Sequence, residues 1–339
     1  MEARNKRGKR SFVLPNRPVI TAWASVAGKK ESEGPLNKYF DMTFQDTYFG
    51  EKTWEQAEKK MQQLALERLL TKSGLDKKDV GVVYSGDLLN QCIGSSFSLN
   101  NTGMPHVGLY GACSTMAESL MLAGMCVDGG YSNRVIAMTS SHFAGSERQY
   151  RFPLGYGGQR PPTAQWTVTG AGAAMVCSEG TGAHLDSCTV GIVKELGVKD
   201  ANNMGAAMAP AAYATIKAHF DDLNVTAEDF DLIVTGDLGQ TGKQLLLELA
   251  RQDGLSLAGR LTDCGTLIFD RENQDVHAGG SGCGCSAVTL CGYLLEKMRI
   301  GKYKRILFCG TGALLSPTSS QQGLPIPGVC HAVSIAGGD

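Results

Sequence analysis

One series of short motifs occurs twice in this chain, in the same order, and this duplication narrows the folds open to it. The repeated pairs are Asp79–Leu88 with Asp229–Leu238, Cys113-Ser114 with Cys285-Ser286, and Arg134–Ser140 with Arg305–Thr311. Their members stand 150, 172 and 171 residues apart, so the spacing inside each copy is similar. Such self-similarity indicates two copies of one structural unit.

Each copy predicts the same alternation of helices and strands. An amphipathic helix from Trp54 to Leu69 has an alanine-rich counterpart from Gly205 to about Phe220. Strands follow, and a further helix begins at Ser114; the strands are 80–84, 107–110 and 134–138, then 232–235 and 305–308. Alternating elements favour parallel strands with helices on both faces. We therefore expect a five-layer α/β/α/β/α fold of two βαβαβ halves, residues 11–190 and 191–339.

The composition indicates where the protein is found more than what it does. A formal net charge of −1 over 339 residues gives no overall attraction to nucleic acid. No apolar run approaches the ~20 residues of a membrane span, and no secretory signal follows the start. The 11 cysteines include no C-x-x-C pair, and Cys283 with Cys285 alone makes a poor zinc site. We expect a cytosolic protein with reduced thiols and no bound metal.

The start of the chain is locally basic, with Arg4, Lys6, Arg7, Lys9 and Arg10 among few apolar residues. A frayed, solvated tail is the simpler interpretation, and a functional surface anchor is the alternative.

The first copy also carries an insertion, roughly residues 143–169, that is rich in Gly, Pro, Arg and Tyr. A long aperiodic loop inside a compact domain is either functional or a surface excursion. Its arginines are suited to carboxylates through their guanidinium forks, and its aromatic side chains to stacking on a ring. These residues are Arg148, Arg151 and Arg160, and Tyr150, Phe152 and Tyr156.

The most specific candidate site is Gly111-Ala112-Cys113-Ser114, where small residues turn a strand into a helix. The free amides and the dipole of the first helical turn favour an anion there. They predict a lowered pKa and a reactive thiolate for Cys113, but they would equally favour a bound carboxylate. An inert, buried cysteine is the third alternative.

A cysteine acyltransferase also needs a base or donor beside its thiol, usually a histidine. His142 follows a predicted strand end and could face Cys113, whereas His219 is expected at the surface of its helix. Asp87 and Asp237 end equivalent parallel strands, where α/β proteins bind ligands, although each could instead cap the next turn. An acid at Asp237, where such an enzyme needs a neutral donor or base, weakens the case for catalysis.

The repeated strand–helix units, with a cysteine at the start of a first-half helix, resemble the thiolase/ketosynthase superfamily. Within it the chain closely resembles the stage V sporulation protein AD family of endospore-forming bacteria, from about Ser11 to His331. The stretches that carry this likeness are 86–91 (GDLLNQ), 111–115 (GACST), 139–142 (TSSH), 147–153 (ERQYRFP), 156–159 (YGGQ), 204–212 (MGAAMAPAA), 278–283 (AGGSGC) and 311–318 (TGALLSPT).

This resemblance implies a protein that binds dipicolinic acid, pyridine-2,6-dicarboxylate, and takes part in its transport across the spore inner membrane in sporulation and germination. It implies synthesis in the cytoplasm of the developing spore and a position peripheral to that membrane, beside membrane-embedded subunits of the same transport system. Thiolase-like proteins are commonly dimers, so the analogy also suggests a homodimer. No cofactor is implied, although calcium could accompany dipicolinate, which chelates it.

Cys113 matches the nucleophile position of the superfamily. The stretch that would carry the catalytic histidine, residues 278–282, contains none. The resemblance therefore favours a non-catalytic binding protein, with an acyl-transferring enzyme that uses Cys113 as the alternative. The expected ligand-binding residues are Asp87, Cys113, Ser114, Ser140, Ser141, His142, Arg148, Arg151, Asp237, Ser281 and Cys283.

Overall fold

A computed structural model describes residues 4–151, 159–257 and 259–338. Within them, thirteen strands form one large sheet, and ten of these make two halves with the same strand order. From the centre outward, the first half is β3 (Val19–Ala27), β9 (Gly170–Cys177), β7 (Arg134–Ser141), β5 (Val82–Gly86) and β6 (His106–Leu109). The second half, likewise outward, is β10 (Ala183–Thr189), β15 (Gly328–Ala336), β14 (Arg305–Ala313), β11 (Leu232–Thr235) and β12 (Leu261–Asp263).

The pairing inside the two halves confirms the duplication. β5 lies parallel to β6 and β7, as β11 does to β12 and β14. The inner pairs are antiparallel in both halves, β7 with β9 and β14 with β15. The halves join where β3 meets β10 through Ile20–Ala183 and Val19–His184. The boundary expected at 190/191 thus falls just after a strand that pairs with β15.

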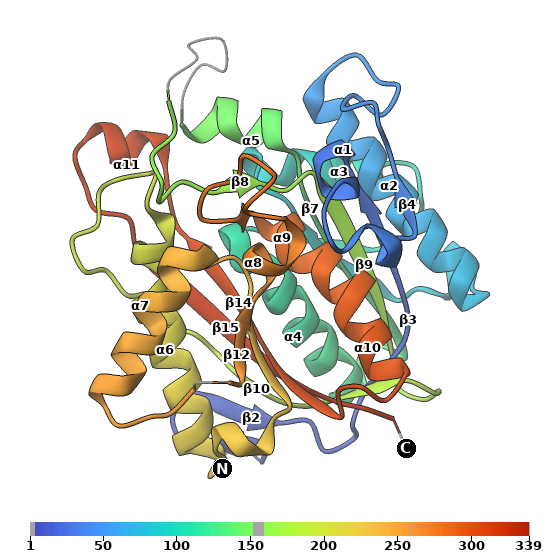
Figure 1. Ribbon diagram of the computed structural model, residues 1–339. Helices are drawn as coiled ribbons and strands as arrows, with labels where there is room; N and C mark the ends of the chain where they lie inside the picture. The colour runs from blue at the N-terminus through green and yellow to red at the C-terminus, as the bar shows by residue number, and fades with distance from the viewer. Residues whose placement is uncertain (1–3, 152–158, 258, 339) are drawn as a thin grey trace.

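The helices form the three helical layers of the expected α/β/α/β/α fold (Figure 1). On the outside, α2 (Trp54–Ser73) packs on the first half, and α6 (Met204–Leu223) packs on the second together with α7 (Gly239–Gln252). In the middle, α4 (Thr115–Asp128) packs on β5, β7 and β9 of one half and on β14 and β15 of the other.

The remaining elements are short. Beside α4, α9 (Cys283–Val288) continues through a π-helical turn, Thr289–Leu294, into α10 (Leu295–Arg299). The other helices are α1 (Lys29–Ser32), α3 (Ile93–Leu99), α5 (Phe143–Tyr150), α8 (Cys264–Ile268) and α11 (Pro317–Gln321). The other strands are β1 (Lys6–Arg7), β2 (Ser11–Val13), β4 (Met42–Thr43), β8 (Trp166–Thr167) and β13 (Gly280–Ser281), the last two forming a separate parallel pair.

Local sequence explains these elements well. The α2 helix begins where the Thr53 hydroxyl accepts from the amide of Gln56, and it ends at Gly74, whose left-handed φ of 68° suits glycine. All eight residues of β9 are buried, because helices cover both of its faces. Glycine at 172 is needed there, because a Cβ atom would lie 2.4 Å from the carbonyl oxygen of Ala287 in α9.

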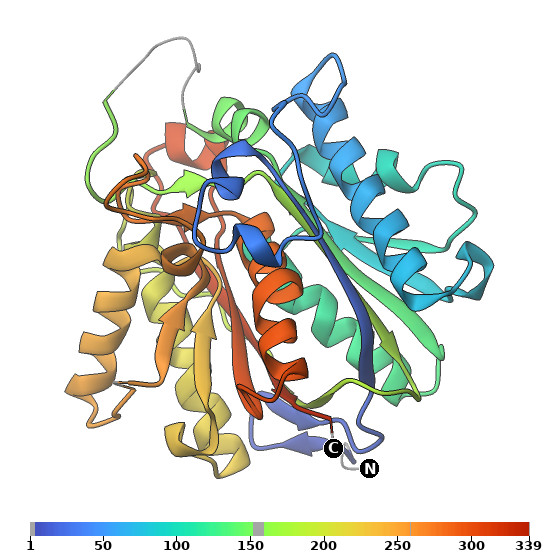
Figure 2. The same ribbon diagram turned by 45° about the vertical axis from the view of Figure 1, so that its right-hand side comes forward.

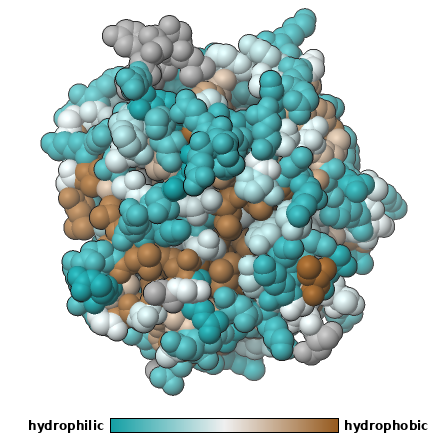
Figure 3. All heavy atoms as spheres, viewed as in Figure 1, coloured by the Kyte–Doolittle hydropathy of each residue, from teal (hydrophilic) through white to brown (hydrophobic). Residues whose placement is uncertain are grey.

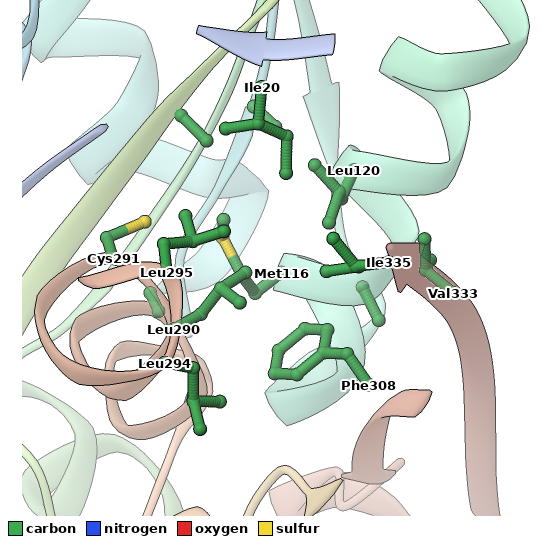
Figure 4. Close-up of a cluster of buried hydrophobic side chains, with 14 of the residues drawn as sticks. Ile20, Met116, Leu120, Leu290, Cys291, Leu294, Leu295, Phe308, Val333 and Ile335 are labelled. Atoms are coloured by element: carbon green, nitrogen blue, oxygen red, sulfur yellow. The ribbon is translucent and has the colours of Figure 1, made fainter. Parts of the chain in front are cut away.

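The main hydrophobic core lies around α4, between the two halves. Met116 and Leu120 of α4 meet Phe308 of β14, Ile335 of β15 and Leu290 of the π-helical turn (Figure 4). Each of these side chains is fully buried. The face of the molecule in Figure 3 is mostly hydrophilic, with hydrophobic areas near its centre and lower left.

Three local expectations are wrong. The basic start is no frayed tail: β1 and β2 form a hairpin, and the Asp222 carboxylate accepts the amides of Lys9, Arg10 and Ser11. The insertion is not a continuous loop, because it contains α5 and β8; Phe152 and Tyr156 lie outside the described residues. His219 is buried rather than at the surface, and its Nδ1 lies 2.8 Å from the Thr189 hydroxyl.

Candidate functional site

Cys113 lies in a tight turn between β6 and α4. The turn is a short 3₁₀ helix, Ala112–Ser114, and α4 begins at Thr115, one residue later than predicted. Ala112 holds a left-handed φ of 51°, which costs a residue with a Cβ about 1–2 kcal/mol. The Ser114 hydroxyl donates to the carbonyl oxygen of Gly111 at 2.7 Å and so closes the turn.

Asp237 lies directly behind this turn. It follows β11, is fully buried, and lies close enough to the Cys113 thiol for its charge to act on it. Its carboxylate accepts the amide of Gly282 at 2.9 Å and the hydroxyls of Thr311 at 2.8 Å and Ser281 at 3.3 Å. These three partners all belong to the second half, so the second half holds this carboxylate behind a turn of the first.

Burial and Asp237 together reverse the expected reactivity of Cys113. The pKa of the thiol is raised well above its usual value, first by desolvation and then by the nearby Asp237 charge. Arg151 lowers this pKa, but its effect is smaller. Burial also raises the pKa of Asp237, to about 6. The prediction of a lowered Cys113 pKa is therefore wrong, because desolvation outweighs the helix start.

A cavity of about 250 Å³ opens in front of Cys113, at the ends of the parallel strands of both halves. Its walls are mostly apolar, and Arg151 is the sole charged side chain among the described lining residues. The lining residues are Leu88, Tyr110, Ala112, Cys113, Ser146, Tyr150, Arg151, Thr167, Met204, Ser281, Ala313, Leu314, Leu315 and Ser316.

Arg151 is held in place from several sides. Its guanidinium is paired with Glu147 one helical turn earlier, and its Nη2 lies 3.6 Å from the sulfur of Met204. The Arg151 side chain is only 8% exposed, so its charge is poorly screened by water. Glu147 also accepts the Thr167 hydroxyl at 2.9 Å, which fixes both partners of the ion pair at the cavity wall.

The structure brings five of the predicted site residues together. Cys113, Arg151 and Ser281 line the cavity, and the Asp237 charge acts on Cys113 from behind. Cys283 packs against Cys113 and Leu88, and its thiol donates to the Ser140 carbonyl oxygen at 3.0 Å.

The other six predicted residues are bonded elsewhere. Asp87 accepts the amide and hydroxyl of Ser95, both at 2.7 Å, and Ser114 closes the turn. Ser140 and Ser141 donate to Glu58 and to the Val168 carbonyl oxygen. His142 caps α5 and contacts the Thr47 carbonyl oxygen, while Arg148 pairs with Glu55 and is half exposed.

No histidine is available as a catalytic base, since each of the six has a partner away from the cavity. The pairs are His106 with Ser85, His142 with Thr47, His184 with Arg17, His219 with Thr189, His277 with Asp275, and His331 with Gly191. What the arrangement offers is a small apolar cavity with a cationic wall and a neutral thiol at its floor.

Sequence reasoning missed most of the apolar wall, chiefly Met204 and the segment 313–316. Both lie in stretches that carry the family resemblance, 204–212 and 311–318. Their ordinary composition gave no signal of a site. Only their place at the ends of α6 and β14 brings them to Cys113.

Solved structures share this architecture. The chain matches 3-oxoacyl-(acyl carrier protein) synthase III from Xanthomonas oryzae with a TM-score of 0.58 and 14% identity, over 94% of this chain and 98% of that one. It matches OleA from Xanthomonas campestris with a TM-score of 0.57 and 13% identity, over 97% and 98%. These likenesses establish the class of fold, which is thiolase-like.

Two sequence comparisons are more specific. Residues 8–336 match the family described as Stage V sporulation protein AD. Stage V sporulation protein AD of Bacillus subtilis (strain 168) is 43% identical over 326 residues, covering 96% of both chains. The chain belongs to the stage V sporulation protein AD family, as the motifs suggested, and is a sporulation protein with a thiolase-like fold.

Proposed function

We propose that the protein binds dipicolinate in the Cys113 cavity, as a non-catalytic component of the system that moves this dianion across the spore inner membrane. It would act in sporulation and germination at the periphery of that membrane, as a homodimer beside membrane-embedded subunits. The observation that carries the proposal is Arg151, the one charged side chain among the described residues that line the cavity, set in an apolar wall beside the Cys113 turn.

The chemistry of the cavity suits a compact aromatic acid. Leu88, Met204, Leu314 and Leu315 supply apolar surface for a flat ring, and a carboxylate can pair with Arg151. Thr167 and Ser281 add polar side chains to the cavity wall. A guanidinium shielded from water binds a carboxylate more strongly than an exposed one does, because little solvent competes.

Calcium finds no protein ligands here. Within the described ranges, no three His, Cys, Asp or Glu side chains come together as a metal site would require. Asp237 already accepts three hydrogen bonds behind Cys113, and Glu147 at the cavity wall is paired with Arg151. We therefore propose that dipicolinate itself, without a protein-bound cation, is the species recognised.

The same contacts argue against acyl transfer. A nucleophilic cysteine needs a thiolate, and both burial and Asp237 keep the Cys113 thiol protonated. Each of the six histidines has a partner away from the cavity, so none stands beside Cys113 to take its proton. Incubation with several acyl-coenzyme A donors should therefore leave the mass of the protein unchanged, and an acyl adduct on Cys113 would favour the enzyme instead.

Calorimetric titration with dipicolinate tests the binding site. Arg151→Gln should weaken binding about 10- to 100-fold, the effect of losing a charge-assisted contact. Arg148→Gln is the matched control, because this neighbour on α5 is half exposed and pairs with Glu55 away from the cavity. Absence of binding to the unmodified protein, or equal loss in both variants, would refute the site.

A further inference from the structure

A second surface stands out at the far end of α4 from the cavity. Two open grooves meet there on either side of Arg10, which lines both. The first lies between the β1–β2 hairpin, the end of α4 and residues 190–192; the second lies between residues 194–196 and α6. We call the two grooves together the basic face.

Cations from three separate parts of the chain gather on this face. They are Lys6, Lys9 and Arg10 of the hairpin, Lys194, and Lys217 of α6. Acids lie among them: Asp128 and Asp221 line the grooves, Asp222 accepts the hairpin amides, and Asp253 lies 3.6 Å from Lys217. The hairpin itself contains no acid, so the excess of positive charge is concentrated on it.

Apolar side chains stand exposed between these cations. Met125 is 43% exposed, Val190 and Ile192 are each 40% exposed, and Leu196 is 68% exposed. They come from the end of α4 and from the segment after β10, and they line the same two grooves. Single apolar side chains set among cations are the pattern of a surface that inserts at the headgroup level of a bilayer.

The hairpin that carries the charges is fixed rather than frayed. Asp222 accepts three of its amides, and Arg10 donates through Nη2 to the carbonyl oxygen of Ala214 in α6. Arg10 therefore ties the hairpin to α6, and the lysines of the hairpin remain exposed.

We propose that the basic face docks on an anionic phospholipid surface, with Lys6 and Lys9 of the hairpin on the headgroup phosphates and the exposed apolar side chains between them. Met125 is twelve residues along the chain from Cys113, about 18 Å at the rise of a helix, so docking leaves the cavity open. The proposal rests on the peripheral membrane location given above, but it does not depend on which ligand the cavity binds.

Co-sedimentation with vesicles tests it. The whole protein should bind vesicles of equal parts phosphatidylglycerol and phosphatidylcholine, bind pure phosphatidylcholine far less, and be released by salt. Lys6→Gln with Lys9→Gln should weaken binding about 30-fold, from about 1 kcal/mol per cation near such a surface. Lys77→Gln with Lys78→Gln removes the same charge from an exposed site elsewhere and should have no effect.

The apolar contribution has its own pair of variants. Leu196→Ser should weaken vesicle binding, whereas Leu324→Ser, at a residue 50% exposed outside both grooves, should not. Dipicolinate titration of every variant shows that the protein is folded and separates this proposal from the cavity. The proposal would be overturned by equal binding to both vesicle types or by equal effects of the test and control pairs. It would also be overturned by no binding to either vesicle type, a result that would point to a protein partner instead.

Discussion

The buried Asp237 carboxyl of the second half lies close enough to the Cys113 thiol of the first half for its charge to raise the pKa of that thiol. In an enzyme with a nucleophilic cysteine, this place would need a group that takes up the thiol proton. Asp237 instead destabilises the thiolate through its own charge, so it holds the proton on sulfur. A first-half helix start and a second-half strand end thus combine into a cavity floor with a protonated thiol.

This pairing predicts the effect of removing the Asp237 charge. Asp237→Asn should lower the pKa of Cys113, so alkylation of this cysteine at mildly alkaline pH should become several-fold faster. Mass spectrometry of the Cys113 peptide against time measures the rate. Asp87→Asn, at the equivalent position of the first half, is the control, because Asp87 is bonded to Ser95 and should leave the rate unchanged. Equal rates in all three proteins would contradict the proposed coupling.

Stability should depend on pH through Glu31, which is fully buried with a pKa raised to about 7 by desolvation. Because the folded pKa lies above the unfolded one of about 4.5, the folded state binds the extra proton. The stability this contributes is present at low pH and is lost as the pH rises through about 7.

Glu31→Gln should therefore gain stability relative to the unmodified protein between pH 5 and pH 8, by about 2 kcal/mol. Urea unfolding at the two pH values gives the difference. Glu33→Gln, two residues away and exposed, should follow the unmodified protein at both. A parallel pH dependence of the Glu31 variant and the unmodified protein would show that Glu31 does not titrate in this range.

Close approach of β14 to the Cys113 turn makes Gly312 sensitive to any side chain. A Cβ atom at 312 would lie 2.7 Å from the carbonyl oxygen of Gly111 and 2.9 Å from the amide of Ser114. Gly312→Ala should cost about 1–3 kcal/mol of stability and weaken dipicolinate binding, since it pushes the turn away. Gly337→Ala, where the nearest atom is 3.5 Å away, should change neither thermal unfolding nor binding.

The β1–β2 hairpin should depend on Asp222, whose carboxylate accepts the amides of Lys9, Arg10 and Ser11. Asp222→Ala removes these acceptors, so trypsin should cleave at the hairpin cations markedly faster. Asp221→Ala, the exposed neighbour, provides the comparison. Cleavage that is equally slow in both variants would mean that pairing of β1 with β2 suffices to hold the hairpin.

Much of the fold could be predicted because its signals are local. The run at 232–235 is β-branched and apolar, and β11 has those bounds; the helix expected from Gly205 to about Phe220 is α6, Met204–Leu223. The predicted end of one strand was wrong: β14 was expected to end at 308 but continues to Ala313. Gly310 and Gly312 contribute to this, because they let α4 and the Cys113 turn approach the strand.

The predictions about the site that were wrong concern residues whose contacts are distant in the sequence. The pKa of Cys113 is set by Asp237 and by burial, neither of which the local motif reveals. Ser140 and Ser141 were expected in the cavity, but on β7 their hydroxyls reach Glu58 of α2 and the Val168 carbonyl oxygen instead. The hairpin was interpreted as a tail because Asp222, which anchors it, is far along the chain.

The middle helix α4 has a consequence for how a ligand can enter and leave. Because α4 packs on strands of both halves and β3 pairs with β10, a swing of one half against the other would break both sets of contacts. A ligand of the cavity would therefore enter and leave past its rim, beside α5 and residues 313–316, rather than through separation of the halves.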